Sequence, residues 1–233
     1  MKLQTAQLLT ILSEYQFFDW EHQKNNKHRI MIGLPENMLI IKEFYQSFGF
    51  DSVENPYSNI KISNKQWVHM EDLFFQLISP YLSTFRLTIV TPFLSNDWEG
   101  ECHLDDIMDD EFADAYKAYK AFLIGNGLYG LTPTLIDYCR GYQIDHIGDF
   151  SILGKMAARN HHYLFFADGD KVFMFTDSLT FRMYCKDGEV LHNEKRKIEQ
   201  LLNPDFLYES LWRTHKVSAF FCYSIDVMDG NVF

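Results

Sequence analysis

The chain has 233 residues, of which 47% are hydrophobic and 16% aromatic, which is ample material for a packed core and argues against intrinsic disorder. The formal net charge is −11, from 32 acidic and 21 basic residues. This charge repels a phosphate backbone, so the sequence disfavours a nucleic-acid-binding protein and favours either a basic partner or a role of the charge in solubility alone. The short basic run at 195–197 lies beside Glu194 and Glu199, and we interpret it as the solvated face of a helix.

The cysteines lie dozens of residues apart and form no C-x-x-C pair. This spacing argues against a disulfide-rich secreted domain and against a zinc site built from paired cysteines. Polar residues interrupt the apolar pattern of residues 1–23, so a signal peptide is not expected, and no apolar run is long enough to cross a bilayer. We therefore expect a soluble, cytoplasmic protein with no membrane partner.

The first half of the chain shows mainly helical periodicity. Apolar residues at helical spacing predict a helix over 3–15, and "LPENMLIIKEFYQSFGF" (34–50) predicts a second one that ends near Gly49. A helix is predicted over 65–82, where Pro80 kinks or ends it, and "RLTIVTPF" (86–93) is typical of a strand.

A further helix is predicted over 104–123, because its apolar residues recur at spacings of three and four and its acidic start suits the helix dipole. "GNGLYG" (125–130) ends it, and "TPTLIDYCRGY" (132–142) is expected to form a short helix or a turn. No helix is predicted between this segment and residue 160.

Strand-like runs separated by Asp/Gly turns dominate from about residue 144. The segments 162–175 and 181–193 each predict a hairpin, and together they predict an antiparallel meander. Helices are predicted over 194–202 and 204–215, and a last strand over 217–227. The sequence thus predicts a single α+β domain (1–233), N-terminal helices followed by a mostly antiparallel sheet with flanking helices. A subdivision into a mainly helical part (1–130) and a sheet-rich part (144–233) remains open.

The stretch "HHYLFFADGDKVFMFTD" (161–177) is the richest in potential metal ligands. His161 and His162 are consecutive, so on a strand their side chains point to opposite faces. Asp168 and Asp170 suit the turn between two strands. We therefore predict a structural hairpin and not a metal site.

Two other motifs have weak functional interpretations. Gly125, Gly127 and Gly130 match G-x-G-x-x-G, but a helix precedes them where a dinucleotide site needs a strand. Cys139 has Arg140 beside it, which would favour a thiolate, although one neighbouring charge is a weak signal. The structural interpretations, a helix stop and a reduced thiol, are preferred.

The most acidic segment is "ECHLDDIMDDEFAD" (101–114). Asp105 and Asp109 share one helix face, as do Asp106 and Asp110, because residues four apart are neighbours on a helix. The segment lacks the E-x-x-H pattern of di-iron bundles and the loop of an EF-hand, so no metal is assigned to it. The structural interpretation of the segment is the solvated start of a helix. The functional prediction is that these four aspartates bind a basic protein partner, with no cofactor.

No H-E-x-x-H, G-x-S-x-G, Walker or kinase motif is present, so no catalytic residue is assigned and the sequence favours a non-catalytic protein. The alternatives that remain open are a metal-assisted hydrolase that uses acidic residues and a regulatory scaffold protein.

Two segments resemble the SUKH superfamily. "LPENMLIIKEFYQSFGF" is similar to its helical element, and "YLFFADGDKVFMFTDSLTFRMYCKDGEV" (163–190) is similar to its sheet, in which short strands alternate with Asp/Gly turns. The resemblance covers about a third of the chain. It implies an α+β fold without a catalytic centre, and a function as an immunity protein that neutralises a toxin by direct binding, as a cell-wall regulator or as a scaffold.

Overall fold

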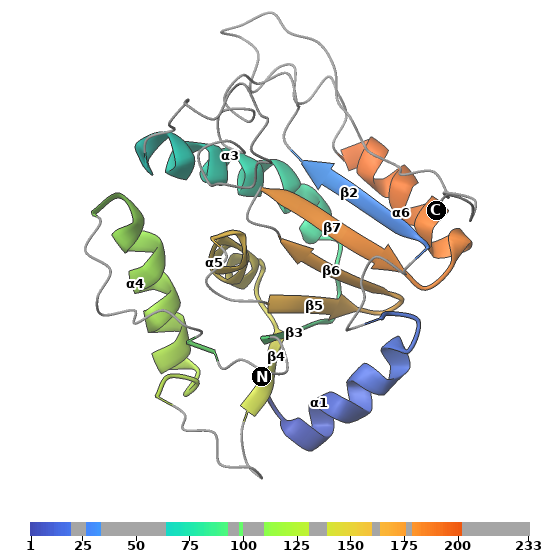
Figure 1. The fold of residues 1–233 in the computed structure, drawn as a ribbon, viewed down its shortest axis with the longest axis horizontal. Helices are drawn as coiled ribbons and strands as arrows, with labels where there is room; N and C mark the ends of the chain where they lie inside the picture. Colours follow the sequence, from blue (N-terminus) through green and yellow to red (C-terminus); the bar gives the residue numbers. More distant parts are fainter. Residues whose placement is uncertain are drawn as a thin grey trace, which may run out of the picture.

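The structure, a computed structural model, describes residues 1–19, 27–33, 64–92, 98–99, 110–130, 139–159, 164–175 and 179–201. Within these ranges the chain forms five α-helices, one short 3-10 turn and a seven-stranded sheet (Figure 1). All neighbouring strands are antiparallel. The α+β class predicted from the sequence is confirmed.

The helices are α1 (Thr5–Leu12), followed by the 3-10 turn η1 (Ser13–Tyr15), α3 (Asn64–Leu82), α4 (Asp110–Gly125), α5 (Ile147–Ala158) and α6 (Gly188–Leu201). The strands are β1 (Lys2–Gln4), β2 (Arg29–Gly33), β3 (Thr88–Pro92), β4 (Cys139–Ile144), β5 (Leu164–Asp168), β6 (Lys171–Phe175) and β7 (Thr180–Cys185). Their order in the sheet is β1-β4-β3-β5-β6-β7-β2. The sheet therefore combines strands from the first and the second half of the chain.

The predicted hairpin is present as β5 and β6. Asp168 pairs with Lys171, and Gly169 between them has a φ of +58°, a conformation that glycine adopts without steric cost. Strand β7 continues the meander, with Phe181 opposite Phe175. The expectation of two strands and a turn is confirmed for the described part of this stretch.

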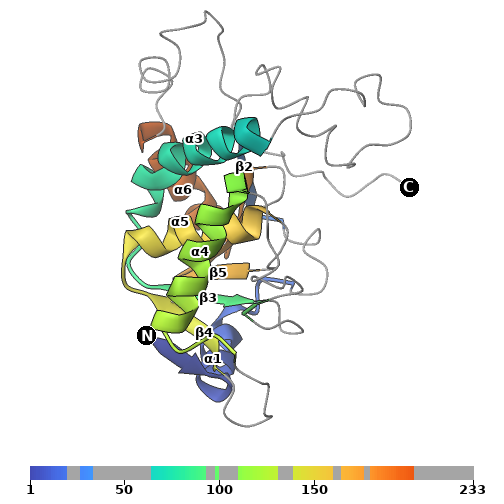
Figure 2. The same ribbon diagram turned by 90° about the vertical axis from the view of Figure 1, so that its left-hand side faces the viewer.

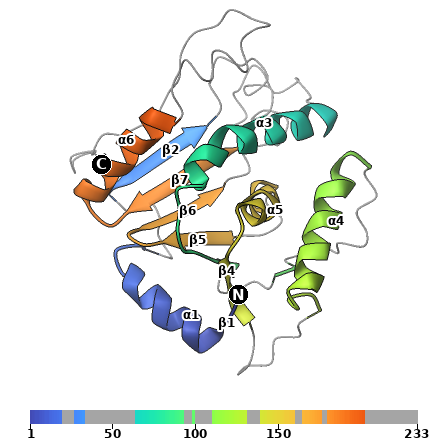
Figure 3. The same ribbon diagram turned by 180° about the vertical axis from the view of Figure 1, so that it is seen from behind.

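Helices cover the two faces of the sheet unequally. Helices α3, α5 and α6 lie across one face, as Figure 3 shows from behind. Helix α4 packs against α3 and α5 at the side of this layer (Figure 2 and Figure 3). On the opposite face α1 contributes Leu8 and Leu12 to a smaller cluster that includes Ile89 and Val172 of the strands.

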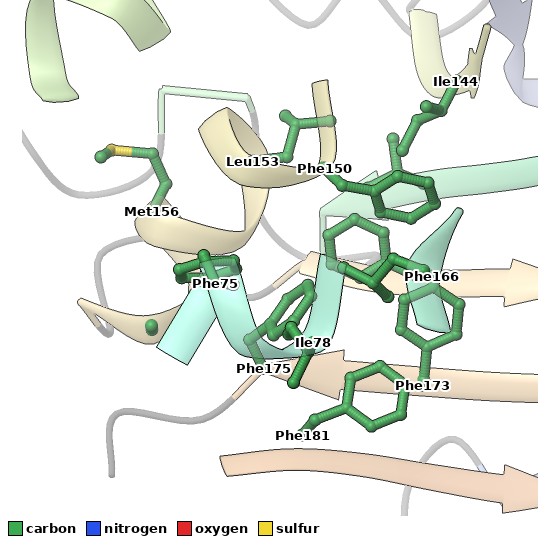
Figure 4. Close-up of a cluster of buried hydrophobic side chains, with 14 of the residues drawn as sticks. Phe75, Ile78, Ile144, Phe150, Leu153, Met156, Phe166, Phe173, Phe175 and Phe181 are labelled. Atoms are coloured by element: carbon green, nitrogen blue, oxygen red, sulfur yellow. The ribbon is translucent and has the colours of Figure 1, made fainter. Parts of the chain in front are cut away.

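The larger core is built mainly from aromatic rings. Phe166 and Phe173 of adjacent strands stack with ring centroids 5.0 Å apart, and Phe175 lies 5.0 Å from Phe75 of α3 (Figure 4). Gly154 lets α5 approach this cluster, because a Cβ there would lie 2.4 Å from the Phe75 ring. Such interdigitated packing fixes α3 and α5 relative to the strands.

Helix α5 is the main element that the sequence analysis does not predict. Its buried residues Phe150, Leu153 and Ala157 have helical spacing, and Asp149 lies in its first turn. Gly148 and Gly154 lower the intrinsic helix propensity of the segment, so tertiary packing on the sheet stabilises this helix more than its local sequence does.

Three further predictions need correction. Residues 139–144 form strand β4 and not a helix or turn, because β1 and β3, both distant in sequence, pair with them. For the same reason Lys2–Gln4 is a strand and not the first turn of a helix. The residues after Gly188 continue as α6 and not as a strand, since a carboxylate oxygen of Asp187 accepts hydrogen bonds from the backbone of Glu189 and Val190.

Other predicted elements agree with the structure or lie outside its description. Helix α3 spans the range predicted for 65–82 and contains Pro80, and α4 covers the later part of 104–123. The helix predicted over 34–50, the helix over 204–215 and the strand over 217–227 lie outside the described residues. Among the described residues, no helix has both the length and the apolar composition that a membrane crossing requires.

Candidate functional site

The acidic segment is described only from the start of α4. Asp105, Asp106 and Asp109 lie outside the described residues, and Asp110 is the first residue of the helix, with an undescribed side chain. The same turn continues with Glu111, which is exposed, and Asp114, whose side chain is 97% exposed. The Glu111 and Asp114 carboxylates therefore face solvent at this end of the helix.

The opposite face of α4 anchors the helix to the core. Tyr116, Tyr119 and Leu123 are buried, and the Tyr119 hydroxyl donates a hydrogen bond to the carbonyl of Trp98. The Trp98 indole N–H in turn donates to the carbonyl of Cys139, at 2.6 Å. This chain of contacts fixes the orientation of the acidic turn relative to the core.

The Asp/Gly turn of the hairpin has a structural role. Asp168 accepts a hydrogen bond from the Leu87 backbone N–H at 3.0 Å and lies 3.7 Å from the Lys171 ammonium. Burial raises the pKa of Asp168, although that hydrogen bond and Lys171 both oppose the shift. His161, His162 and Asp177 of the same stretch lie outside the described residues.

The two weaker motifs also have structural roles. Gly125 ends α4, and Gly127 and Gly130 adopt φ values of +61° and +66° in the loop that follows, as expected for a helix stop. Cys139 is buried and donates a weak hydrogen bond to the Gly141 carbonyl. Burial raises the pKa of the Cys139 thiol, so the neighbouring arginine does not produce a thiolate.

A buried ion pair joins α3 to the C-terminal end of α5. Arg159 donates two hydrogen bonds to the carboxylate of Glu71, at 2.8 and 2.7 Å, and a third to the carbonyl of Phe112. Its guanidinium also lies 4.9 Å from the centroid of the Phe112 ring, while Lys155 bonds to Asp72 at 2.5 Å. Burial alone would lower the pKa of Arg159, but the bonds and charge of Glu71 raise it. These groups are mutually satisfied, which is typical of a structural contact.

A second buried polar cluster joins α3, α6 and the start of β6. The Glu194 carboxylate accepts hydrogen bonds from Tyr81 and Lys197, each at 2.6 Å, and from Lys171 at 3.4 Å. Burial favours its neutral form, but these partners outweigh burial and lower the pKa of Glu194. Nearby Cys185 is buried, which raises the pKa of its thiol to about 12. The cluster thus contains the neutral thiol of Cys185 and the paired carboxylate of Glu194, and its hydrogen bonds attach α6 to α3 and β6.

A surface pocket of about 420 Å³ opens at the other end of α5. It lies between the end of α3, the start of β3, the end of β4 and the first turn of α5. Its apolar lining comes from Leu82, Phe85, Ile144, Ile147 and Phe150. Of these, Leu82, Ile144 and Phe150 belong to the larger core cluster, and Figure 4 shows the last two. The volume falls within the range of small-molecule sites, roughly 300 to 1,000 Å³.

Polar groups also line this pocket. Thr88 lines it and is only 2% exposed, whereas Arg86 and His146, which also line it, are exposed. Asp145 is exposed as well and accepts a hydrogen bond from Gln143 at 3.2 Å. That carboxylate also forms an ion pair of 3.1 Å with the Met1 amino group. The pocket thus joins an apolar surface to groups of both charges.

Within the described ranges, no three or more His, Cys, Asp and Glu side chains are placed to hold a metal ion. Comparison with protein-family models, with curated proteins and with solved structures gives no match for this chain. The geometry and the sequence patterns are therefore the basis for any functional assignment.

The sequence analysis identified the acidic segment but missed the pocket and both buried clusters. Arg86 lies two residues before Thr88, the first residue of β3, whereas His146 directly precedes α5, and none of the three belongs to a recognisable motif. The only local signal was the strand pattern around Thr88, whose alternation puts residues 88 and 90 on one face. The position of the start of α5 on that face results from tertiary packing and could not be predicted from the local sequence.

Proposed function

We propose that this protein is a non-catalytic protein-binding module whose acidic surface docks a basic protein partner, and that it neutralises a toxin by occlusion. The single observation that supports this most is the exposed acidic turn of α4. Glu111 and Asp114 continue the acidic run of residues 101–110 on a helix whose other face is locked into the core. The resemblance to the SUKH superfamily supports the same class of function.

Electrostatics would act mainly on the encounter. A net charge of −11 attracts a basic protein over about one Debye length, roughly 8 Å at physiological salt. Carboxylates that already face solvent on a fixed helix need little rearrangement to meet such a partner. Aromatic side chains buried on contact would supply most of the affinity, as in other protein interfaces.

The test starts with capture of the tagged protein from its native cells, followed by intact-complex mass spectrometry and metal analysis. The expected result is a basic polypeptide in stoichiometric amount. A retained metal ion or small molecule without a protein partner would contradict the proposal and favour the metal-assisted hydrolase.

The complex is then rebuilt from purified components to test the surface. Replacing Asp105, Asp106, Asp109 and Asp110 together by alanine should weaken binding by about 10- to 100-fold and reduce its salt dependence. The control is the matched removal of four exposed acids from other elements, Glu14, Asp170, Glu189 and Glu199. Equal effects of the two sets would show that net charge, and not this surface, determines binding.

A further inference from the structure

The pocket at the start of α5 has a buried hydroxyl group without a partner. Thr88 pairs with Ile144 across the sheet, and Val90, two residues later, belongs to the core on the helical side. Residues that pair directly, and residues two apart on a strand, share a face, so the Thr88 side chain points toward α5 and the pocket. Within the described part of the chain, its hydroxyl forms no hydrogen bond.

This lack of a partner is unusual for a side chain that is only 2% exposed. Thr91, three residues further along β3, is 3% exposed and donates a hydrogen bond of 2.8 Å to the Pro92 carbonyl. Thr180, at the start of β7, is likewise buried and has an interaction partner. The Thr88 hydroxyl therefore stands out among the buried threonines of the described sheet as one that a bound ligand would satisfy.

Arg86 provides an available positive charge on the same pocket. It is exposed and lines the opening, and in the described ranges it forms no ion pair and no hydrogen bond. This contrasts with Arg159 at the far end of α5, each of whose three guanidinium nitrogens donates a hydrogen bond. A free guanidinium beside an apolar pocket suits a carboxylate, which it can hold by two parallel hydrogen bonds.

The first turn of α5 adds backbone donors to this opening. His146 precedes the helix in an extended conformation, and its side chain makes no capping hydrogen bond. The first N–H groups of a helix have no acceptor in regular helix geometry, and the helix dipole makes this end positive. In α5 the Asp149 N–H already donates to the His146 carbonyl at 3.0 Å, so the donors that remain for a ligand are those before Asp149. Asp145 and Asp149 oppose an anion here, but Asp145 is paired with the Met1 amino group, and Asp149 is not one of the residues that line the pocket.

From these features we propose that the pocket binds a small organic carboxylate with an apolar body. The carboxylate lies near Arg86 and the first turn of α5, the Thr88 hydroxyl donates a hydrogen bond to the ligand, and the apolar body packs against Leu82, Phe85 and Phe150. This ligand class matches a pocket of about 420 Å³ that combines an apolar wall with one unpaired cation. The site is separate from the acidic surface of α4 and does not depend on the proposed function.

The test is a titration of the isotope-labelled 233-residue chain, in which binding is measured from the amide chemical shifts in NMR spectra. The probes are hexanoate, benzoate and 3-phenylpropionate, each compared with its neutral carboxamide. We expect saturable shifts at the amides of residues 86–88 and 146–148, with the carboxylates binding about tenfold more tightly than the carboxamides.

Variants separate the two polar contacts. Arg86→Gln should weaken carboxylate binding about tenfold and leave carboxamide binding nearly unchanged, whereas Arg196→Gln, on α6 away from the pocket, should change neither. Thr88→Val should weaken both probe types about fivefold, and Thr88→Ser should retain most of the binding because it keeps the hydroxyl.

Two results would overturn the proposal. One is the absence of saturable shifts at these amides with all three carboxylates. The other is equal binding of carboxylates and carboxamides that Arg86→Gln does not alter. Neither result bears on the basic protein partner, whose binding is measured through the four aspartates of the acidic segment.

Discussion

The two ends of α5 differ in whether the polar side chains beside them have hydrogen-bond partners. At the C-terminal end, Arg159 makes three hydrogen bonds to Glu71 and the Phe112 carbonyl and lies over two aromatic rings. At the N-terminal end, Arg86 and Thr88 face a pocket without such partners in the described part of the chain. One end of the helix therefore stabilises the fold, whereas the other retains polar groups without partners among the described residues.

The largest expected loss of stability is at the C-terminal end of α5, where Arg159 is paired with Glu71. Glu71→Ala should lower the free energy of unfolding by about 3–5 kcal/mol, because it leaves the Arg159 guanidinium buried without its counter-ion. Urea unfolding followed by circular dichroism measures this change. The neighbouring Asp72→Ala is the control, and since Asp72 is 57% exposed it should cost less than about 1 kcal/mol.

A double variant sharpens the interpretation of the same pair. Glu71→Leu combined with Arg159→Met removes both charges and should restore most of the stability lost in Glu71→Ala. If the double variant were as unstable as the single one, packing or backbone changes, and not an unpaired charge, would explain the loss.

The second-largest loss of stability is expected at the Glu194 cluster, which lies in the same helical layer. Glu194→Gln should cost about 2 kcal/mol near neutral pH, because the hydrogen bonds from Tyr81, Lys171 and Lys197 lose their charged acceptor.

The stability that Glu194→Gln loses should depend on pH, and the direction of this dependence follows from the pKa of Glu194. The folded pKa of Glu194 is lowered, so its stabilisation is complete above the unfolded pKa and disappears as pH falls through the folded pKa. The difference between wild type and Glu194→Gln should therefore shrink in acid, as urea unfolding at several pH values would reveal. A difference that grows in acid would contradict the lowered pKa.

The middle of α5 gives a third, smaller effect. In Gly154→Ala the added methyl group would lie 2.4 Å from the Phe75 ring and 2.9 Å from the Phe175 ring. The rings must shift, which should cost about 1–2 kcal/mol after the gain in helix propensity. Gly148→Ala, where a Cβ meets nothing within 4 Å, is the matched control and should be neutral or stabilising. Equal stabilities of the two variants would show that the core near α5 accommodates the extra volume.

The smallest change in stability is expected at the pocket beside the N-terminal end of α5, and it should be a gain instead of a loss. Thr88→Val replaces a buried hydroxyl without a partner by a methyl group and should raise the free energy of unfolding by about 1 kcal/mol. Thr91→Val, which removes a satisfied hydroxyl on the same strand, should instead lower it. Urea unfolding of both variants tests the contrast, and a loss of stability in Thr88→Val would mean that the hydroxyl already has a stabilising partner.

The sequence predicted the elements whose signals are local. Helix α3 and the hairpin of β5 and β6 follow from periodicity and from the Asp-Gly turn, and both agree with the structure. The Asp187-Gly188 pair shows the limit of such signals, because the same dipeptide suits a hairpin turn and a helix start. In the structure the Asp187 carboxylate caps α6, and the buried Ile198 favours the helix.

The elements and sites that sequence reasoning missed depend on contacts between distant residues. Strand β4 exists because β1 and β3 pair with it, and α5 is stabilised by its packing on aromatic rings of the strands. The pocket needs the end of α3, the start of β3 and the start of α5 in one place. No local pattern around Arg86 or Thr88 carries that information, whereas the acidic segment was visible because its residues are consecutive.

The most direct test of the contrast between the two ends of α5 is urea unfolding of wild type and Thr88→Val, with and without 3-phenylpropionate. We expect the variant to be the more stable protein without the probe, and wild type to gain more stability when the probe is added, because only the folded state binds it. A less stable variant, together with no effect of the probe on either protein, would contradict the assignment of the pocket beside the N-terminal end of α5 as a ligand site.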